Sequence, residues 1–285
     1  MLCLNLAMAI FRSPTIALMP DITVENKRTT ANGIINFMGG VGSILALAGG
    51  AILYDLHPTV PFWTAAIVLL FALMIVSNSI KEKRDAIQYS LTEEKPKIKY
   101  KKELNPSTMC SLFAIFFWFV AYQGIEALFT LFATNVYGMT DGQASLTLSF
   151  FALSFLLFAI PSGFLGAKFG KKRIIMIGII GLIVVFLSVN LIDSMWMLRT
   201  LLFIGGMFWA CININSYPFI VSTGSEEAIG TRTGLYYLVS SLAAITGPPL
   251  MGYIVDLTDY NWLFVVAASC MALALISIVC VRHTG

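Results

Sequence analysis

Nine apolar runs, each long enough to cross a lipid bilayer, dominate this chain. A helix needs about 20 apolar residues to span the hydrocarbon core, so the runs predict an all-α, polytopic membrane helix bundle. Hydrophobic residues make up 58% of the chain and charged residues only 12%, which excludes an ordinary soluble domain. The predicted spans are Leu2–Pro20, Gly33–Tyr54, Pro61–Ile80, Met109–Phe132, Ala144–Gly166, Ile174–Leu191, Met197–Ile220, Gly234–Val255 and Asn261–Val281.

Lysine and arginine residues fall in alternate connections between the predicted spans. Counted in this way, 16 of the 18 lie on one side of the membrane; the exceptions are Arg12, inside the first span, and Arg199, near the sixth connection. Positive charge is retained on the cytoplasmic face. We therefore expect a multi-pass protein of the cell membrane, with residues 81–107 and the C-terminus in the cytoplasm. The net charge of +3 follows from this topology and does not indicate a nucleic-acid partner.

No pattern in the chain points to an enzyme, a metal site or a cofactor. The cysteines lie singly in apolar runs, without a CxxC pair or the spacing of metal ligands. The sequence has neither a nucleophile–base constellation nor the glycine-rich loop that binds ATP phosphates. The expected partners are therefore the lipid bilayer and a small-molecule substrate. The five cysteines are Cys3, Cys110, Cys211, Cys270 and Cys280.

The chain contains an internal repeat. The second and eighth predicted spans match without a gap, so that Gly33 corresponds to Gly234 and Asp55 to Asp256. Repeated helices at corresponding places are typical of transporters with duplicated halves. Gly247 is followed by two prolines in the eighth span, and we expect them to break or kink that helix.

One long polar segment divides the chain into unequal parts. Three predicted spans precede the segment and six follow it, whereas a duplicated protein should have six on each side. We expect residues 1–80 to be the rest of an N-terminal half, residues 81–107 to be a cytoplasmic linker and residues 108–285 to be a six-helix C-terminal half. The three helices that would come first form a missing N-terminal segment in this interpretation.

A short basic loop resembles a motif of the major facilitator superfamily. The segment Gly163-Phe-Leu-Gly-Ala-Lys-Phe-Gly170-Lys-Lys-Arg173 is similar to the family's loop Gly-x-Leu-x-Asp-Arg-x-Gly-Arg-Arg. Glycines permit its tight turn, and the basic cluster holds it in the cytoplasm. The resemblance implies a twelve-helix major facilitator fold, of which this chain carries the last nine transmembrane helices.

Two further segments resemble sugar–cation symporters of that superfamily. The stretch from Arg12 to Asp21 is similar to the fourth helix of plant sucrose–proton symporters and melibiose-type carriers, and Asn213 to Phe219 is similar to a Ser-x-Pro-Phe segment of the sucrose group. The resemblance implies symport of a sugar, either a glycoside or a disaccharide, with a proton or another coupling cation. Transport would proceed by alternating access, as the two halves rock about a central site.

Only two ionisable residues lie deep inside predicted spans, Arg12 and Glu126. Each costs about 2.5–3.5 kcal/mol at a helix centre, so such residues normally face a protein interior or a water-filled cavity. We expect Arg12 to bind substrate and Glu126 to couple transport to a proton or cation. A structural ion pair or a snorkelling head group is the alternative for both.

Neutral polar side chains gather in the same two regions, on the spans that begin each three-helix unit. Their amides and hydroxyls both donate and accept hydrogen bonds, as sugar hydroxyls require, while Trp118, Trp209 or Tyr217 would stack on a sugar ring. Interhelical hydrogen bonds are the alternative role for each amide. The predicted substrate-binding residues, besides Arg12, are Gln123, Asn213, Asn215, Ser216 and Tyr217.

Two other functions remain open from the sequence. A cavity with a lone acid also suits a major facilitator exporter of drugs or metabolites. The unequal halves suit an inactive or accessory fragment that needs a partner.

Overall fold

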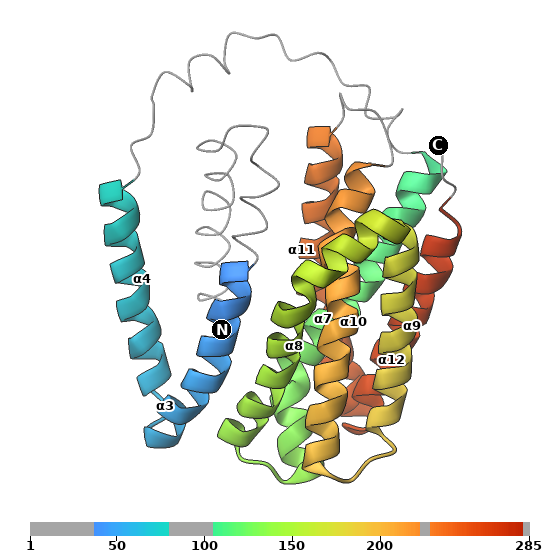
Figure 1. Ribbon diagram of the computed structural model, residues 1–285. Helices are drawn as coiled ribbons and strands as arrows, with labels where there is room; N and C mark the ends of the chain where they lie inside the picture. Colours follow the sequence, from blue (N-terminus) through green and yellow to red (C-terminus); the bar gives the residue numbers. More distant parts are fainter. Residues whose placement is uncertain (1–36, 80–104, 223–228, 282–285) are drawn as a thin grey trace. The chain divides into compact units, whose positions relative to one another are not determined.

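The computed structural model describes residues 37–79, 105–222 and 229–281, in which every regular element is helical (Figure 1). Eight helices of this described part are long and apolar enough to cross a membrane. They cover eight of the nine predicted spans, so the prediction of a polytopic helix bundle is confirmed. The first predicted span, Leu2–Pro20, lies outside the described residues.

The observed helices match the apolar runs but extend further at their ends. The helix Phe37–Leu56 contains a π-helical turn, η2 (Leu45–Gly49), followed by α3 (Gly50–Leu56). The other helices are α4 (Val60–Ser79), α7 (Pro106–Tyr137), α8 (Asp141–Phe169), α9 (Lys171–Val189), α10 (Met195–Val221), α11 (Ile229–Leu257) and α12 (Trp262–Val279).

Capping residues explain why α7 and α8 begin before their apolar runs. The side chain of Asn105 accepts a hydrogen bond from the backbone N–H of Thr108 at 2.7 Å, and Pro106 occupies the first turn of α7. Thr140 and Gln143 form a reciprocal capping box at the start of α8. Both arrangements satisfy backbone N–H groups that a helix start leaves without partners.

The chain divides into two compact units, each described here by itself. The first contains residues 37–42 and 61–79 of the described part, and the second contains residues 43–60 and 105–281. Residues 43–60 join the second unit because they pack on α8, where the Ser145 hydroxyl donates to the Leu47 carbonyl at 3.0 Å. Leu47 lies in η2, where a π-helical turn alters the backbone bonding pattern. The boundaries predicted around the 81–107 linker stay a prediction.

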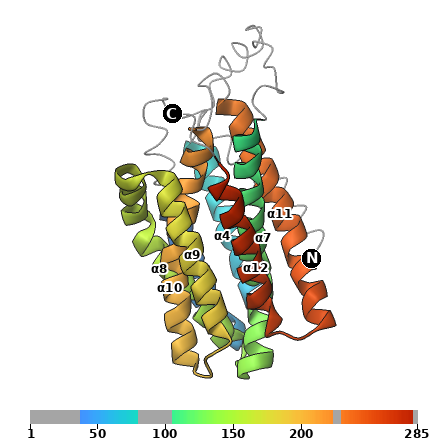
Figure 2. The same cartoon turned by 90° about the vertical axis from the view of Figure 1, so that its right-hand side faces the viewer.

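The six helices α7 to α12 form two three-helix units whose members exchange partners. The first helix of one unit, α7, packs mainly on α11 and α12 of the other, and α10 packs mainly on α8 and α9. The third helices, α9 and α12, lie side by side (Figure 2). This reciprocal packing is the arrangement expected of an inverted repeat within a six-helix half. It buries Trp118, Phe129 and Phe264 completely.

Charge separates the two ends of this six-helix bundle. The lysine end holds the α8–α9 connection, and five of the six Lys and Arg residues that the structure describes belong to it: Lys168, Lys171, Lys172, Arg173 and Arg232. The opposite end holds the α7–α8, α9–α10 and α11–α12 connections (Figure 1). It is called the carboxylate end below, because Asp141, Asp193, Asp256 and Asp259 lie there. The described residues therefore keep the asymmetry on which the topology prediction depends.

The basic loop at the lysine end also caps two helices. Gly170 has a φ of 92°, which glycine adopts without strain, and it turns the chain sharply from α8 into α9. Lys171 Nζ then donates to the Pro218 carbonyl near the end of α10 at 3.3 Å. Lys172 Nζ donates to the Val281 carbonyl just beyond α12 at 2.6 Å. Cations at helix C-termini are stabilising because the unpaired carbonyls there carry partial negative charge.

Two prolines were expected to break or kink α11, and the expectation of a break is wrong. The helix is continuous through Pro248 and Pro249. A transmembrane helix tolerates proline where neighbouring helices and local adjustments compensate the freed backbone groups. Gly247 provides such a close neighbour, since a Cβ atom at this position would lie 2.8 Å from the Val120 carbonyl of α7.

Candidate functional site

The middle of α7 carries the predicted coupling residue Glu126 together with Tyr122 and Gln123. The three residues fall within about one helical turn and share a face. Gln123 is half-buried and Glu126 is exposed in the bundle. The Tyr122 hydroxyl lies close enough to the Glu126 carboxylate for the two to interact. This face therefore presents a carboxylate, a phenol and an amide in a span that is otherwise apolar.

An aromatic cluster holds Tyr122 in place. Its ring stacks on Trp209 of α10, with 4.3 Å between centroids and 5° between planes. Phe151 of α8 lies 6.1 Å from the Tyr122 ring, and Phe119 of α7 meets Trp209 edge-on at 5.7 Å. These four residues, Phe119, Tyr122, Phe151 and Trp209, are called the aromatic cluster below. Stacked and edge-on contacts restrict the ring of Tyr122 and so fix the position of its hydroxyl beside Glu126.

Asn215 joins two helices. Its side chain is 3% exposed, and its amide nitrogen donates to the Ser162 carbonyl at 3.2 Å, the Ser162 hydroxyl at 3.1 Å and the Cys211 carbonyl at 3.0 Å. Gly166 of α8 makes room for the amide, because a Cβ atom there would overlap the Asn215 side-chain oxygen. The donors of Asn215 are thus used between α10 and α8.

Ser216 and Tyr217 connect α10 to α11 in the same way. The Ser216 hydroxyl is fully buried and lies 3.0 Å from the hydroxyl of Tyr236. The Tyr217 hydroxyl lies 3.1 Å from the hydroxyl of Thr233. Both residues therefore make the interhelical hydrogen bonds that were the alternative to ligand binding.

Of the two remaining predicted site residues, Asn213 lies within the described residues and Arg12 does not. Asn213 is half-buried on α10, one turn or less from the residues above. Arg12 lies outside the described residues. Gln123 and Glu126 are thus the predicted residues that the structure brings together on an accessible face.

The two tryptophans predicted to stack on a sugar ring are both buried in the bundle. Trp118 is fully buried and has no room to stack on a ligand, so that expectation is wrong for this residue. Trp209 is 3% exposed because Tyr122 covers its face. Sequence inspection missed Phe119 and Phe151 altogether. Aromatic residues make up 13% of the chain, and nothing in the sequence says which of them meet between helices.

No metal centre is evident in the described ranges. Within residues 37–79, 105–222 and 229–281, no three His, Cys, Asp or Glu side chains converge as metal ligands would. The arrangement on α7 instead offers one carboxyl group and one rigid aromatic surface. Those groups can bind and release a proton and contact an apolar or cationic molecule.

A polytopic helix bundle with an inverted helical repeat is an architecture typical of membrane transporters. The family model described as Major Facilitator Superfamily matches residues 1–144 and 134–284, so the chain belongs to this superfamily. The bacterial homologue of the human lysosomal transporter Spinster, solved in an inward-facing and occupied conformation, superimposes with a TM-score of 0.58 at 16% identity, covering 94% of this chain and 70% of that one.

The relatives of this chain include resistance proteins and a siderophore iron transporter. Tetracycline resistance protein, class D, of Salmonella ordonez is 26% identical over 86% of this chain and 62% of its own length. Chloramphenicol resistance protein CraA of Acinetobacter baumannii is 27% identical over 58% of this chain and 41% of its own. Siderophore iron transporter 2 of Schizosaccharomyces pombe is 29% identical over 53% of this chain and 26% of its own. The chain thus spans less than two thirds of these relatives.

Proposed function

We propose that this chain acts in the proton-coupled export of lipophilic or planar small molecules. The observation that carries the proposal is the pairing of Glu126 with an aromatic cluster on the accessible face of α7. A carboxylate at mid-span is costly unless it has a partner or a function. Here it stands beside rigid aromatic surface, which suits a ligand with a flat apolar body and a cationic or donor group.

A simple exchange at Glu126 would couple the two fluxes. The ionised carboxylate attracts the ligand on the lysine end, which we place in the cytoplasm on the basis of its charge. After the helices re-orient, a proton from the other side binds the carboxylate and weakens its attraction for the ligand. The ligand leaves, the protonated site returns to the lysine end, and the carboxyl group releases its proton there. Each cycle therefore carries one ligand out and one proton in.

Sugar–cation symport is the weaker candidate. It was inferred from the amides and hydroxyls of Gln123, Asn213, Asn215 and Ser216. Asn215 already donates to α8. Ser216 donates to the Asn213 carbonyl of its own helix and is hydrogen-bonded to Tyr236 of α11, which leaves fewer groups for sugar hydroxyls. The names of the relatives reported above refer to antibiotics and a siderophore and give sugar transport no support. Gln123 and Asn213 are the residues that still favour it.

Ligand binding to the purified chain in lipid nanodiscs tests the proposal. The panel contains tetracycline, chloramphenicol and tetraphenylphosphonium on one side, and sucrose and melibiose on the other. We expect members of the first group to raise the thermal unfolding temperature, with no shift from either sugar. Stabilisation by a sugar with none from the three lipophilic compounds would replace the export proposal with sugar symport. Stabilisation by none of the five, in a sample that unfolds cooperatively, would overturn both.

A further inference from the structure

Arg199 is the exception to the charge separation, because it lies at the carboxylate end, near the start of α10. Its Nε donates to the Thr147 hydroxyl of α8 at 3.2 Å. Its guanidinium carbon lies 4.8 Å from the ring centre of Trp196 and 5.6 Å from that of Phe150. Thr147 is fully buried. The guanidinium is therefore held by a buried hydroxyl and two aromatic faces, as a preformed binding group would be.

Two adjoining hollows open beside this arginine. The smaller, of about 280 Å³, is lined by Phe150, Trp196, Arg199, Thr200 and Phe203. The larger, of about 470 Å³, lies between α9 and α10 and shares Trp196 and Thr200 with the smaller. Together they make one groove along α10, called the α10 groove below.

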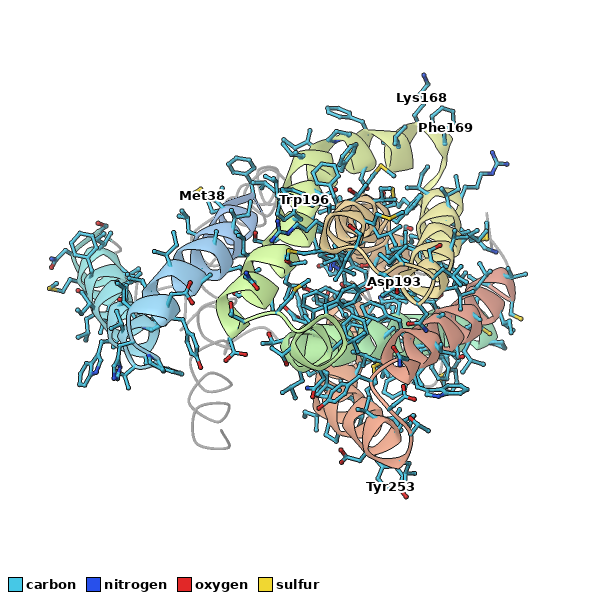
Figure 3. The ribbon with its side chains drawn as sticks, turned by 90° about the horizontal axis from the view of Figure 1, so that it is seen from below. Met38, Lys168, Phe169, Asp193, Trp196 and Tyr253 are labelled. Atoms are coloured by element: carbon cyan, nitrogen blue, oxygen red, sulfur yellow. The ribbon has the colours of Figure 1, made fainter. Side chains whose placement is uncertain are left out.

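The wall of the larger hollow is apolar and open to the surroundings. Leu191 is 83% exposed, Trp196 68% and Met197 55%. Trp196 stands out beside α8 (Figure 3). Tryptophan is enriched where a membrane span meets water, with its ring at the level of the lipid head groups. The groove thus begins at head-group level and continues along apolar side chains.

The charge at the head of the groove is not neutralised by the described part of the protein. Arg199 makes no ion pair with a residue of the described ranges, and Thr147 takes one of its five N–H groups. Four carboxylates lie at the same end of the bundle, and none of them forms an ion pair with Arg199: Asp141, Asp193, Asp256 and Asp259. A cation held among aromatic rings, with donors to spare, is complementary to an anion that brings its own apolar body.

We propose that the α10 groove binds an anionic glycerophospholipid. Its phosphate accepts hydrogen bonds from the planar donors of Arg199, and an acyl chain follows the hollow between α9 and α10. Arginine binds phosphate oxygens in a bidentate manner. A water-soluble anion would leave the apolar wall uncovered. This site lies apart from Glu126 and does not depend on the export proposal.

Fluorescence quenching by brominated lipids tests the site, since Trp196 forms part of it. The chain is reconstituted into vesicles that contain either dibrominated phosphatidylglycerol or dibrominated phosphatidylcholine at equal, low mole fraction. We expect the anionic lipid to quench about fivefold more effectively at this site. That excess should disappear in Trp196→Phe, which removes the reporter, and in Arg199→Gln, which removes the charge.

Lys168→Gln is the matched control. Lys168 also lies over an aromatic ring, that of Phe169 at 5.3 Å, but at the lysine end of α8 (Figure 3). The variant should keep the excess quenching. Thr200→Phe, which fills the neck between the hollows and leaves Arg199 in place, should lose it. Equal quenching by the two lipids in the unaltered chain, or an undiminished excess in a folded Arg199→Gln or Thr200→Phe variant, would overturn the proposal.

Discussion

The helices α7 and α10 hold equivalent places in the two three-helix units, yet they use their polar residues differently. Each begins its unit and packs mainly on the second and third helices of the other. On α10, the side chains of Asn215, Ser216 and Tyr217 all make hydrogen bonds to α8 or α11. On α7, Gln123 is half-buried and Glu126 is exposed. Equivalent position in a repeat therefore does not imply an equivalent role.

The difference follows from the neighbours of each helix. Ser162 and Gly166 of α8 place acceptors and space opposite Asn215, so its amide is satisfied inside the protein. The neighbours of the α7 face are aromatic rings, which fix Tyr122 by packing. We infer that α10 supplies much of the interhelical bonding of this half, whereas α7 supplies its ligand contacts.

Among variants that test this difference between α7 and α10, we expect the largest effect, on ligand binding, from a substitution at Glu126. In Glu126→Gln the side chain keeps its shape but loses its charge and its titratable proton. Binding of tetraphenylphosphonium should weaken by about tenfold or more, since a charge pair with the ligand is lost. The decrease in binding at acidic pH, expected of the unaltered chain as Glu126 is protonated, should vanish. Titration of the ligand in nanodiscs at several pH values measures both.

Asp256→Asn is the control for that titration. It removes an exposed carboxylate near the end of α11, at the carboxylate end of the bundle. It should leave affinity and pH dependence unchanged. If the two variants weakened binding equally, the effect would be one of general charge, and Glu126 would lose its assigned role.

A smaller effect is expected from Asn215, measured against Asn213 on the same helix. Asn215→Ala removes two hydrogen bonds to Ser162 of α8 and one to Cys211 of α10 from a buried site. It should lower the free energy of unfolding by about 1–2 kcal/mol. Asn213→Ala, at a half-buried position, should change it by less than about 0.5 kcal/mol. Thermal unfolding of both variants in detergent gives the comparison. The reverse order would mean that α10 presents Asn215 to a ligand rather than to α8.

The smallest effect is expected at Tyr217. Tyr217→Phe removes one hydroxyl contact, to Thr233 at 3.1 Å. Single side-chain hydrogen bonds between membrane helices average about 0.6 kcal/mol. Tyr253→Phe, which alters a 64% exposed tyrosine on α11, serves as the reference (Figure 3). A thermal shift for Tyr217→Phe no larger than that reference would show that this contact stabilises nothing, while a loss of ligand binding would move Tyr217 into the site.

Helix positions were predictable because apolar length is a local property. The run Met109–Phe132 became α7, and the polar caps Asn105 and Thr140 explain why α7 and α8 begin a few residues early. The role of Asn215 was not predictable, because the sequence does not tell which helix faces it. The interpretation as a sugar site depended on that missing information. Likewise, Trp118 and Trp209 look alike in the sequence, and only the packing of the helices shows that Trp209 stacks on Tyr122.

The exchanged pairing of the two three-helix units sets an order for assembly during synthesis. The chain of α7 is complete at Tyr137, but its main partners end at Leu257 and Val279. At translation rates of about 5–20 residues per second, α7 waits roughly 7–30 s for them. A chain that stops before α12 therefore loses more than its last helix. It also deprives α7 and α9 of a principal packing partner, so this half is completed only when its final helix enters the membrane.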